Sequence, residues 1–218
     1  MPAAPPEGPP LSVALEAALA GLTPRRPRRP RVQALAATAI SLGYAALTLA
    51  AVALRHDLAA LPRTWLLLYL GAWLAGFALP LWLALVPRPG QVMPRWRPAG
   101  LVAAASAAGF VVAGLALARR APASLHAGLD HAHGCLSIGL VTAVAPVVAG
   151  TLLLRGAAPV GSRRTAAALG ASGGALGGLV LHLHCAIADR LHVGLVHGGL
   201  VALAALLAAA TVPRALRP

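Results

Sequence analysis

The chain has 218 residues, of which 59 % are hydrophobic and 11 % are charged, and its mean hydropathy is +0.78. These values exclude an ordinary soluble globular domain and indicate a polytopic membrane protein. The net charge of +13 comes from arginines in short clusters between long apolar runs, without the basic, aromatic-rich face typical of nucleic-acid binding, so we expect no direct nucleic-acid contact.

Residues 1–31 are predicted to be a cytoplasmic segment in front of the membrane domain. Residues 1–10 are rich in proline and are predicted to be disordered. A short amphipathic helix should follow, because leucines recur there at near-helical spacing, at Leu11, Leu15, Leu19 and Leu22. Gly21 and Pro24 end this helix. The run PRRPRRPR that follows, up to Arg31, is interpreted as a topology signal lying against anionic headgroups.

Six apolar runs without Asp, Glu, Lys or Arg come next, each long enough for a helix to cross about 30 Å of hydrocarbon. The predicted spans are Val32–Leu54, Thr64–Val86, Pro98–Ala118, Cys135–Leu154, Thr165–His184 and Leu191–Val212. The first run is too long for the core of a signal peptide, so it is interpreted as a membrane anchor. Pro80 and Pro146 lie inside spans, where they should kink a helix without forbidding it. We therefore predict an all-α domain of six transmembrane helices over residues 32–218.

The distribution of arginines predicts the orientation of this domain. If both termini are cytoplasmic, 13 of the 18 arginines lie on the cytoplasmic side of the bilayer. The remaining five lie outside, at Arg55, Arg63, Arg119, Arg120 and Arg190. Because short cytoplasmic loops carry an excess of positive charge, this asymmetry favours an N-in, C-in topology.

The fifth span carries a stripe of glycines. Gly170, Gly174 and Gly178 are four residues apart, and Gly173 and Gly177 lie on the adjoining row. Such a stripe lets a second helix approach backbone to backbone. In water each glycine would cost about 1 kcal/mol relative to alanine, but in lipid a helix satisfies its own backbone hydrogen bonds. We predict a central packing helix with reactive groups at its end.

The histidines and cysteines segregate strongly in this topology. All eight histidines and both cysteines fall in the outer half of the molecule, at His56, His126, His131, His133, Cys135, His182, His184, Cys185, His192 and His197. His131 and Cys135 are four residues apart, and His182 and Cys185 are three apart, so each pair can share a helix face. If the fourth and fifth spans adjoin, these four side chains can converge on tetrahedral zinc or another soft metal.

Three interpretations of the outer histidines and cysteines stay open at this point. The first is a metal site that draws on His131, His133, Cys135, His182, His184, Cys185 and His197, although no cofactor is certain from the sequence. The second is a disulfide between Cys135 and Cys185 in an oxidising compartment. In the third, the cysteines are small buried residues and the histidines are interfacial hydrogen-bonding groups. His197 lies deeper than the others and is expected to face another helix or water instead of lipid.

No enzymatic constellation is present in the sequence. The acidic residues outside the tail are Asp57, Asp130 and Asp189, and there is neither an HExxH motif nor a GxSxG nucleophile elbow. The run Gly170–Gly178 lacks the GK[ST] ending and the preceding strand of a phosphate-binding loop. We expect that the protein is not an enzyme.

Several stretches together resemble a known family. The run HGCLSIGLVTAVAPVVAGTLLLRGAAP (His133–Pro159) is followed by a glycine-rich span that leads into LHLHC (Leu181–Cys185), with His197 downstream. With the leucine helix and the arginine–proline junction, Leu11–Arg31, this pattern resembles the NrsF-like membrane anti-sigma factors of bacteria, to which CarR-type light-response regulators are also likened. The histidine-rich loop before Cys135 departs from the family pattern, as does alanine in place of proline directly after Cys185.

The resemblance implies a six-helix protein of the bacterial inner membrane that holds an extracytoplasmic-function sigma factor until a stress signal arrives. It also implies that the cytoplasmic N-terminal segment contacts the sigma factor, and that Cys135 and Cys185 sense metal or oxidative stress. The residue pattern, taken without the resemblance, also indicates a leucine-striped helix able to enter a partner's groove and a thiol–imidazole cluster remote from that helix.

Two other functional classes remain as alternatives. A metal-handling or haem-binding membrane protein, such as a small transporter, would use histidines that reach a ligand through the bilayer, from His131, His133, His182, His192 or His197. In a purely structural membrane subunit, the histidines and cysteines would have no ligand.

Overall fold

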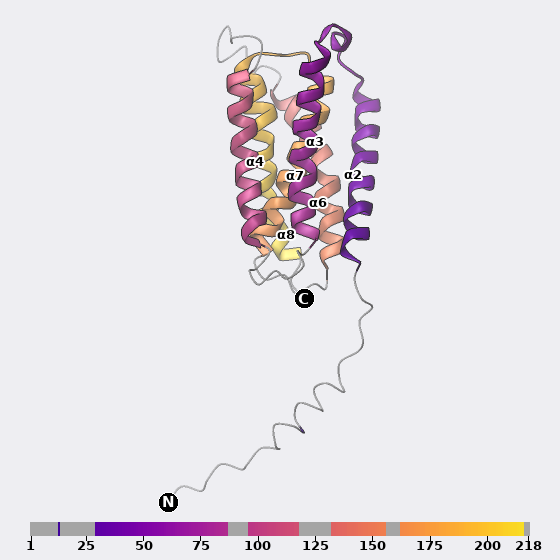
Figure 1. The fold of residues 1–218 in the computed structure, drawn as a ribbon, viewed down its shortest axis with the longest axis vertical. Helices are drawn as coiled ribbons and strands as arrows, with labels where there is room; N and C mark the ends of the chain where they lie inside the picture. The colour runs from indigo at the N-terminus through magenta and orange to yellow at the C-terminus, as the bar shows by residue number, and fades with distance from the viewer. Residues whose placement is uncertain (1–12, 14–28, 87–95, 118–131, 156–161, 216–218) are drawn as a thin grey trace, which may run out of the picture.

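The computed structural model describes residues 13, 29–86, 96–117, 132–155 and 162–215. Several sequence-based predictions lie outside these residues: the predicted disorder of residues 1–10, the leucines Leu11, Leu15, Leu19 and Leu22, most of the arginine–proline run, and the histidines His126 and His131. Within the described residues the fold is all-α, as predicted, with six long helices (Figure 1).

The six long helices are α2 (Pro30–Val52), α3 (Arg63–Leu85), α4 (Trp96–Leu117), α6 (Ala132–Leu154), α7 (Ser162–His184) and α8 (Gly199–Ala215). A short 3₁₀ turn, η1 (Leu58–Ala60), lies between α2 and α3. A π-helical segment, η2 (His192–Gly198), runs directly into α8 and forms a single span with it, His192–Arg214. All six spans are long and apolar enough to cross a membrane, which confirms the predicted six-helix, multi-pass architecture.

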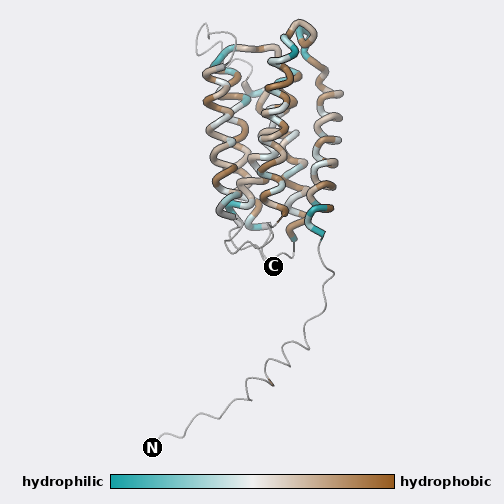
Figure 2. The backbone as a smooth tube through the Cα atoms, viewed as in Figure 1, coloured by the Kyte–Doolittle hydropathy of each residue, from teal (hydrophilic) through white to brown (hydrophobic). Residues whose placement is uncertain are grey.

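The helices run side by side along one axis (Figure 1). The start of α2 and the end of α8 lie at one end of the bundle, and η1 lies at the opposite end. The most hydrophilic residues gather toward the ends of the helices, as Figure 2 shows. Both α3 and α6 continue through their internal prolines, Pro80 and Pro146. This arrangement leaves two separate polar ends joined by apolar helices.

Helix α7 occupies the centre of the bundle. In its most apolar stretch, 89 % of the residues are buried inside the structure, compared with 17 % in α2. Its glycines make this possible, because a Cβ at Gly174 would lie 2.5 Å from the Cα of Val201 in α8. A Cβ at Gly173 would lie 2.5 Å from the carbonyl oxygen of Ala143 in α6. The two rows of glycine therefore let two helices, α8 and α6, each approach α7 to backbone contact.

The glycine stripe does not face a single partner along its whole length. Gly170 packs against the backbone of Ala204 in α8, whereas Gly178, eight residues later, packs against the indole ring of Trp73 in α3. Gly177, on the adjoining row, meets the carbonyl oxygen of Gly139 in α6. The glycines of α7 thus position three helices around it.

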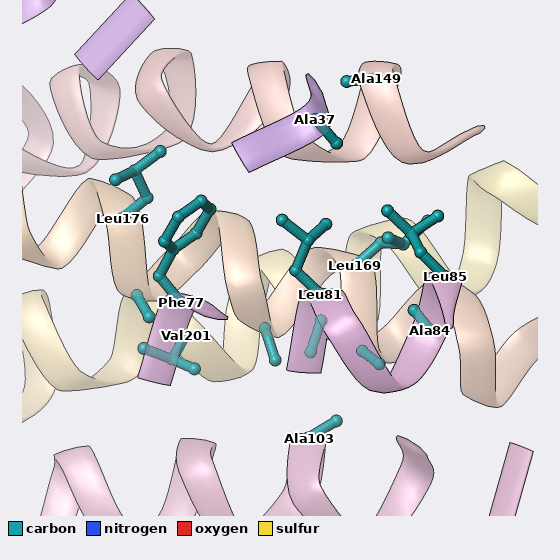
Figure 3. Packing of buried hydrophobic residues seen from close by; sticks show 14 of the residues in the cluster. Ala37, Phe77, Leu81, Ala84, Leu85, Ala103, Ala149, Leu169, Leu176 and Val201 are labelled. Carbon is teal, nitrogen blue, oxygen red and sulfur yellow. The ribbon is translucent and has the colours of Figure 1, made fainter. Parts of the chain in front are cut away.

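Large apolar side chains fill the space that the glycines leave between the helices. Figure 3 shows Phe77 and Leu81 of α3 together with Leu169 and Leu176 of α7 and Val201 of α8. Each of these five side chains is at most 1 % exposed. Large residues from α3 and α7 therefore interlock with smaller ones from the other helices, as in a close-packed interior.

Candidate functional site

Four metal-ligating side chains converge at the end of the bundle where η1 lies. Cys135 is in the first turn of α6, Cys185 directly follows α7, and His192 and His197 belong to η2. One ligand atom from each of the four lies within 4.8 Å of all the others. We call these four residues the Cys2His2 cluster.

The distances within the Cys2His2 cluster are short. The two Sγ atoms of Cys135 and Cys185 are 3.9 Å apart and are not joined by a disulfide. The Sγ of Cys185 lies 3.5 Å from Nε2 of His192. The rings of His192 and His197 meet edge to face, with centroids 5.1 Å apart and planes at 75°. The four groups therefore enclose one small volume from different directions.

Local structure around Asp189 sets the position of His192. Helix α7 ends at His184, although the N–H of Cys185 still donates to the carbonyl of Leu181 at 2.7 Å. The next helical segment begins after Asp189, whose carboxylate accepts a hydrogen bond from the N–H of His192 at 2.9 Å. This is the geometry of an N-terminal cap, in which a side-chain oxygen satisfies an otherwise unpaired backbone donor. The cap fixes where the helix that carries both histidines begins.

The π-helical geometry of η2 explains how two histidines five residues apart reach the same site. In an α-helix, residues five apart differ by about 140° around the axis and face different neighbours. A π-helix closes its hydrogen bonds from i to i+5, so His192 and His197 lie about one turn apart on one side. The spacing of five carries no α-helical face signal, so it could not be recognised from the sequence.

Helix α4 holds η2 in place through close backbone contacts. A Cβ at Gly194 would lie 2.6 Å from Cγ of Leu115, and one at Gly198 would lie 2.7 Å from the carbonyl oxygen of Phe110. Gly114 in turn faces the Cα of Gly194. Glycine on both sides of the contact lets α4 support the segment that presents the two imidazoles.

The Cys2His2 cluster is buried in apolar surroundings. His192 is 0 % exposed and His197 is 1 % exposed, and Leu181, Val196 and Leu200 pack around the thiols. Among the residues that the structure describes, neither ring nitrogen of His197 has a hydrogen-bond partner. A buried polar group without a partner costs about 1–3 kcal/mol. A metal ion would therefore satisfy a nitrogen atom that the protein leaves unpaired.

The α2–α3 connection is tied to the end of α7 beside the cluster. Arg55 makes a two-point ion pair with Asp57, from Nε at 2.6 Å and from Nη2 at 2.8 Å. The N–H of Arg55 donates to the carbonyl of Leu183 at 2.9 Å, and His184 Nδ1 donates to the carbonyl of Ala53 at 2.9 Å. The hydrogen bond from Arg55 lowers the pKa of the Asp57 carboxyl to about 2.

A polar cavity of about 580 Å³ adjoins this tie and is lined by Arg55, His56, Asp57, Leu61, Trp65, Ala186 and Ala188. A second pocket, of about 10 Å³, shares Arg55, Trp65 and Ala188 with it and is also lined by His197. Its size is close to that of one water molecule. The smaller pocket therefore lies between the residues of this tie and one member of the Cys2His2 cluster, His197.

The structure brings together only part of the predicted ligand set. Cys135, Cys185 and His197 belong to the cluster. His192, which was named only for the alternative metal-handling function, is the fourth member. Another predicted ligand, His133, lies in the first turn of α6, before the predicted fourth span; it is exposed and accepts a hydrogen bond from Ser137 through its carbonyl.

The two histidines of α7 have other surroundings. The ring of His182 stacks on Tyr69 of α3, with centroids 5.0 Å apart and planes at 3°, and lies 4.9 Å from the ring of Trp65. The Nδ1 of His184 donates the hydrogen bond to the carbonyl of Ala53 that is described above. Although His182 is only three residues before Cys185, both histidines of α7 therefore have partners outside the cluster, His182 in the rings of Trp65 and Tyr69 and His184 in the carbonyl of Ala53.

The Cys2His2 cluster supports two kinds of chemistry. Two thiolates and two imidazoles are a common donor set for zinc and other soft divalent ions. Alternatively, an oxidant can join the thiols into a disulfide, for which the two sulfur atoms must move from 3.9 Å to a bond length of about 2.05 Å. Both reactions link Cys135 of α6 to Cys185 at the end of α7, and metal binding also involves the two histidines of η2.

A family model described as negative regulator of sigma F matches residues 19–217 of the chain. The match includes all six long helices and all four residues of the Cys2His2 cluster. Comparison with curated proteins and with solved structures found no match.

Proposed function

Because this chain belongs to the NrsF family of negative regulators of sigma F, we propose that it is a membrane-bound anti-sigma factor for an extracytoplasmic-function sigma factor. It acts by binding and not by catalysis. The sigma factor is held at the membrane until metal or oxidative stress at the Cys2His2 cluster releases it. The observation that carries the sensing role is the burial of both thiols of the chain, 3.9 Å apart, in one site with two histidines.

The proposal places the protein in the bacterial inner membrane with both termini in the cytoplasm. Two features support this orientation. The predicted cytoplasmic segments hold 13 of the 18 arginines. The Cys2His2 cluster also lies at the end of the bundle opposite the start of α2 and the end of α8. The thiols then face the extracytoplasmic side, where stress agents arrive first.

Partner binding is assigned to the cytoplasmic leucine helix. Leu11, Leu15, Leu19 and Leu22 form one apolar stripe in the sequence, a pattern suited to a groove on another protein. The arginines that follow can pair with acidic residues beside such a groove. In the sequence this segment precedes α2, from which the arginine–proline run separates it.

Release requires that the stimulus favour one packing of the bundle over another. An agent that binds both packings equally shifts nothing, whatever its affinity. The cluster meets this requirement, because its ligands come from α6, from the end of α7 and from η2. A metal ion held by all four ligands favours arrangements in which the three elements stay close together, whereas a disulfide joins only α6 to the end of α7.

The test is co-purification from membranes of the full chain with the extracytoplasmic-function sigma factors of the same genome. We expect one of these factors to be retained. Replacing Leu15 and Leu19 by aspartate should weaken retention at least about tenfold, because two buried apolar contacts are lost. The matched control is Glu16→Ala, on another face of the same helix, which should bind normally. Retention of no such factor would refute the proposal.

A metal-handling or haem-binding membrane protein is the second candidate. The Cys2His2 cluster and the polar cavity at the same end of the bundle favour this function. Purified protein in liposomes distinguishes the two functions. Metal flux without a partner protein, or stoichiometric haem absorbance, would support the second candidate.

A further inference from the structure

We propose that Cys135, Cys185, His192 and His197 form a tetrahedral site for a soft divalent cation of the zinc class, and that the π-helical segment η2 is what completes it. This inference deepens the proposed function and rests on it for its regulatory meaning. The site itself is argued from geometry, charge and an unpaired histidine.

Two interatomic distances within the cluster match the edges expected of a tetrahedron around one ion. Zinc–sulfur bonds are about 2.3 Å and zinc–nitrogen bonds about 2.05 Å long, which gives a sulfur–sulfur edge of about 3.8 Å and a sulfur–nitrogen edge of about 3.6 Å. The observed distances are 3.9 Å between the two Sγ atoms and 3.5 Å from Cys185 Sγ to His192 Nε2. The sulfur–sulfur distance is far from the value of about 2.05 Å that a disulfide requires.

Charge balance also favours a divalent cation. Two thiolates and two neutral imidazoles carry a charge of −2, so a divalent ion makes the site neutral, as its apolar surroundings require. Binding releases one proton from each thiol to the solvent. The nearby carboxylate of Asp189 already accepts the hydrogen bond from the N–H of His192. The donor set therefore suits soft ions and not calcium or magnesium, which prefer oxygen ligands.

His197 supplies an independent observation. Its side chain is 1 % exposed, and within the described residues both ring nitrogens lack a hydrogen-bond partner. Its ring lies edge to face with that of His192, whose Nε2 is beside Cys185. Coordination of one ring nitrogen to an ion would remove much of the cost of burying this group.

The ion would also select the helical register of η2. His192 and His197 reach the same ion only while the segment is π-helical, since in an α-helix the second imidazole would turn about 140° away. The same π-helical turn packs Gly194 and Gly198 against α4. A bound ion therefore stabilises the observed contact of η2 with α4.

The test uses purified, reduced full-length protein and Co²⁺ as a spectroscopic probe for zinc. We expect one equivalent of Co²⁺, with tetrahedral ligand-field bands and thiolate-to-cobalt charge-transfer absorption. The variants Cys135→Ser, His192→Ala and His197→Ala should each lower the affinity at least about tenfold. The matched control, His133→Ala, removes an exposed histidine near Cys135 and should bind as the wild type does.

A rescue variant separates loss of a ligand from loss of the fold. His197→Cys restores a fourth donor and should recover Co²⁺ binding, with stronger charge-transfer absorption from a third thiolate. Wild-type affinity in both histidine variants, or no binding by the reduced wild type, would overturn the proposal. Retention of the sigma factor is measured on the same samples. A normal cobalt spectrum without sigma-factor binding contradicts only the proposed function, whereas sigma-factor binding without cobalt binding contradicts only the site.

Discussion

Replacement of Gly174 by alanine should destabilise the bundle, although alanine is the better helix former. The added Cβ would lie 2.5 Å from the Cα of Val201, which is a backbone atom and cannot rotate away. Optimal carbon–carbon contact is about 3.5 Å, so α8 must move by about 1 Å from α7. Overpacking of this kind costs about 1–3 kcal/mol. We therefore expect the free energy of unfolding to fall by that amount.

The assay is equilibrium unfolding of the purified protein in mixed micelles, followed by helical circular dichroism as the fraction of denaturing detergent rises. The matched control is Gly71→Ala in α3, where an added Cβ meets no atom within 4 Å. This variant should stay within about 0.5 kcal/mol of the wild type. If Gly174→Ala were as stable as Gly71→Ala, α7 and α8 would not be in backbone contact, and the reasoning on the glycine rows would be wrong.

Three further predictions concern the end of the bundle that carries the thiols. Folding lowers the pKa of the Asp57 carboxyl to about 2 from about 3.9. The stabilisation from its pair with Arg55 should therefore be complete above about pH 5 and be lost as the pH falls from about 4 to 2. The difference in unfolding midpoint between the wild type and Asp57→Asn should vanish over that range. Replacing both Cys135 and Cys185 by serine should leave membrane insertion intact but blunt induction of the sigma-dependent genes, and unchanged induction by every metal and oxidant tested would remove the sensing role. In that cysteine-free background, His56→Cys should react in intact cells with a maleimide that is confined to the periplasm, and reaction only after the inner membrane is opened would reverse the proposed orientation.

The tie between the α2–α3 connection and the end of α7 gives the site a physical link to α2. Ala53 and Arg55, just after α2, hydrogen-bond to His184 and Leu183 at the end of α7. Cys185 directly follows His184 in the sequence. A change at this thiol therefore acts close to the helix that connects to the proposed partner-binding segment.

The class of fold could be predicted from the amino-acid pattern alone. Runs of about 20 apolar residues can form only membrane-spanning helices, because in lipid each backbone group must find its partner within the segment. The glycine spacing in the fifth span likewise indicated a packing helix, and the structure places α7 at the centre. The resemblance to NrsF-like proteins was also readable from the sequence, and the family match over residues 19–217 confirms it.

Which histidines meet the thiols depends on the three-dimensional packing of the helices and could not be predicted from spacing. Sequence spacing favoured His131 and His182, because residues three and four apart share a face of an α-helix. His182 instead stacks on Tyr69, and the cluster is completed by His192 and His197. Their spacing of five becomes a shared face only in a π-helix, and that irregular turn depends on contacts with α4 that are distant in the sequence.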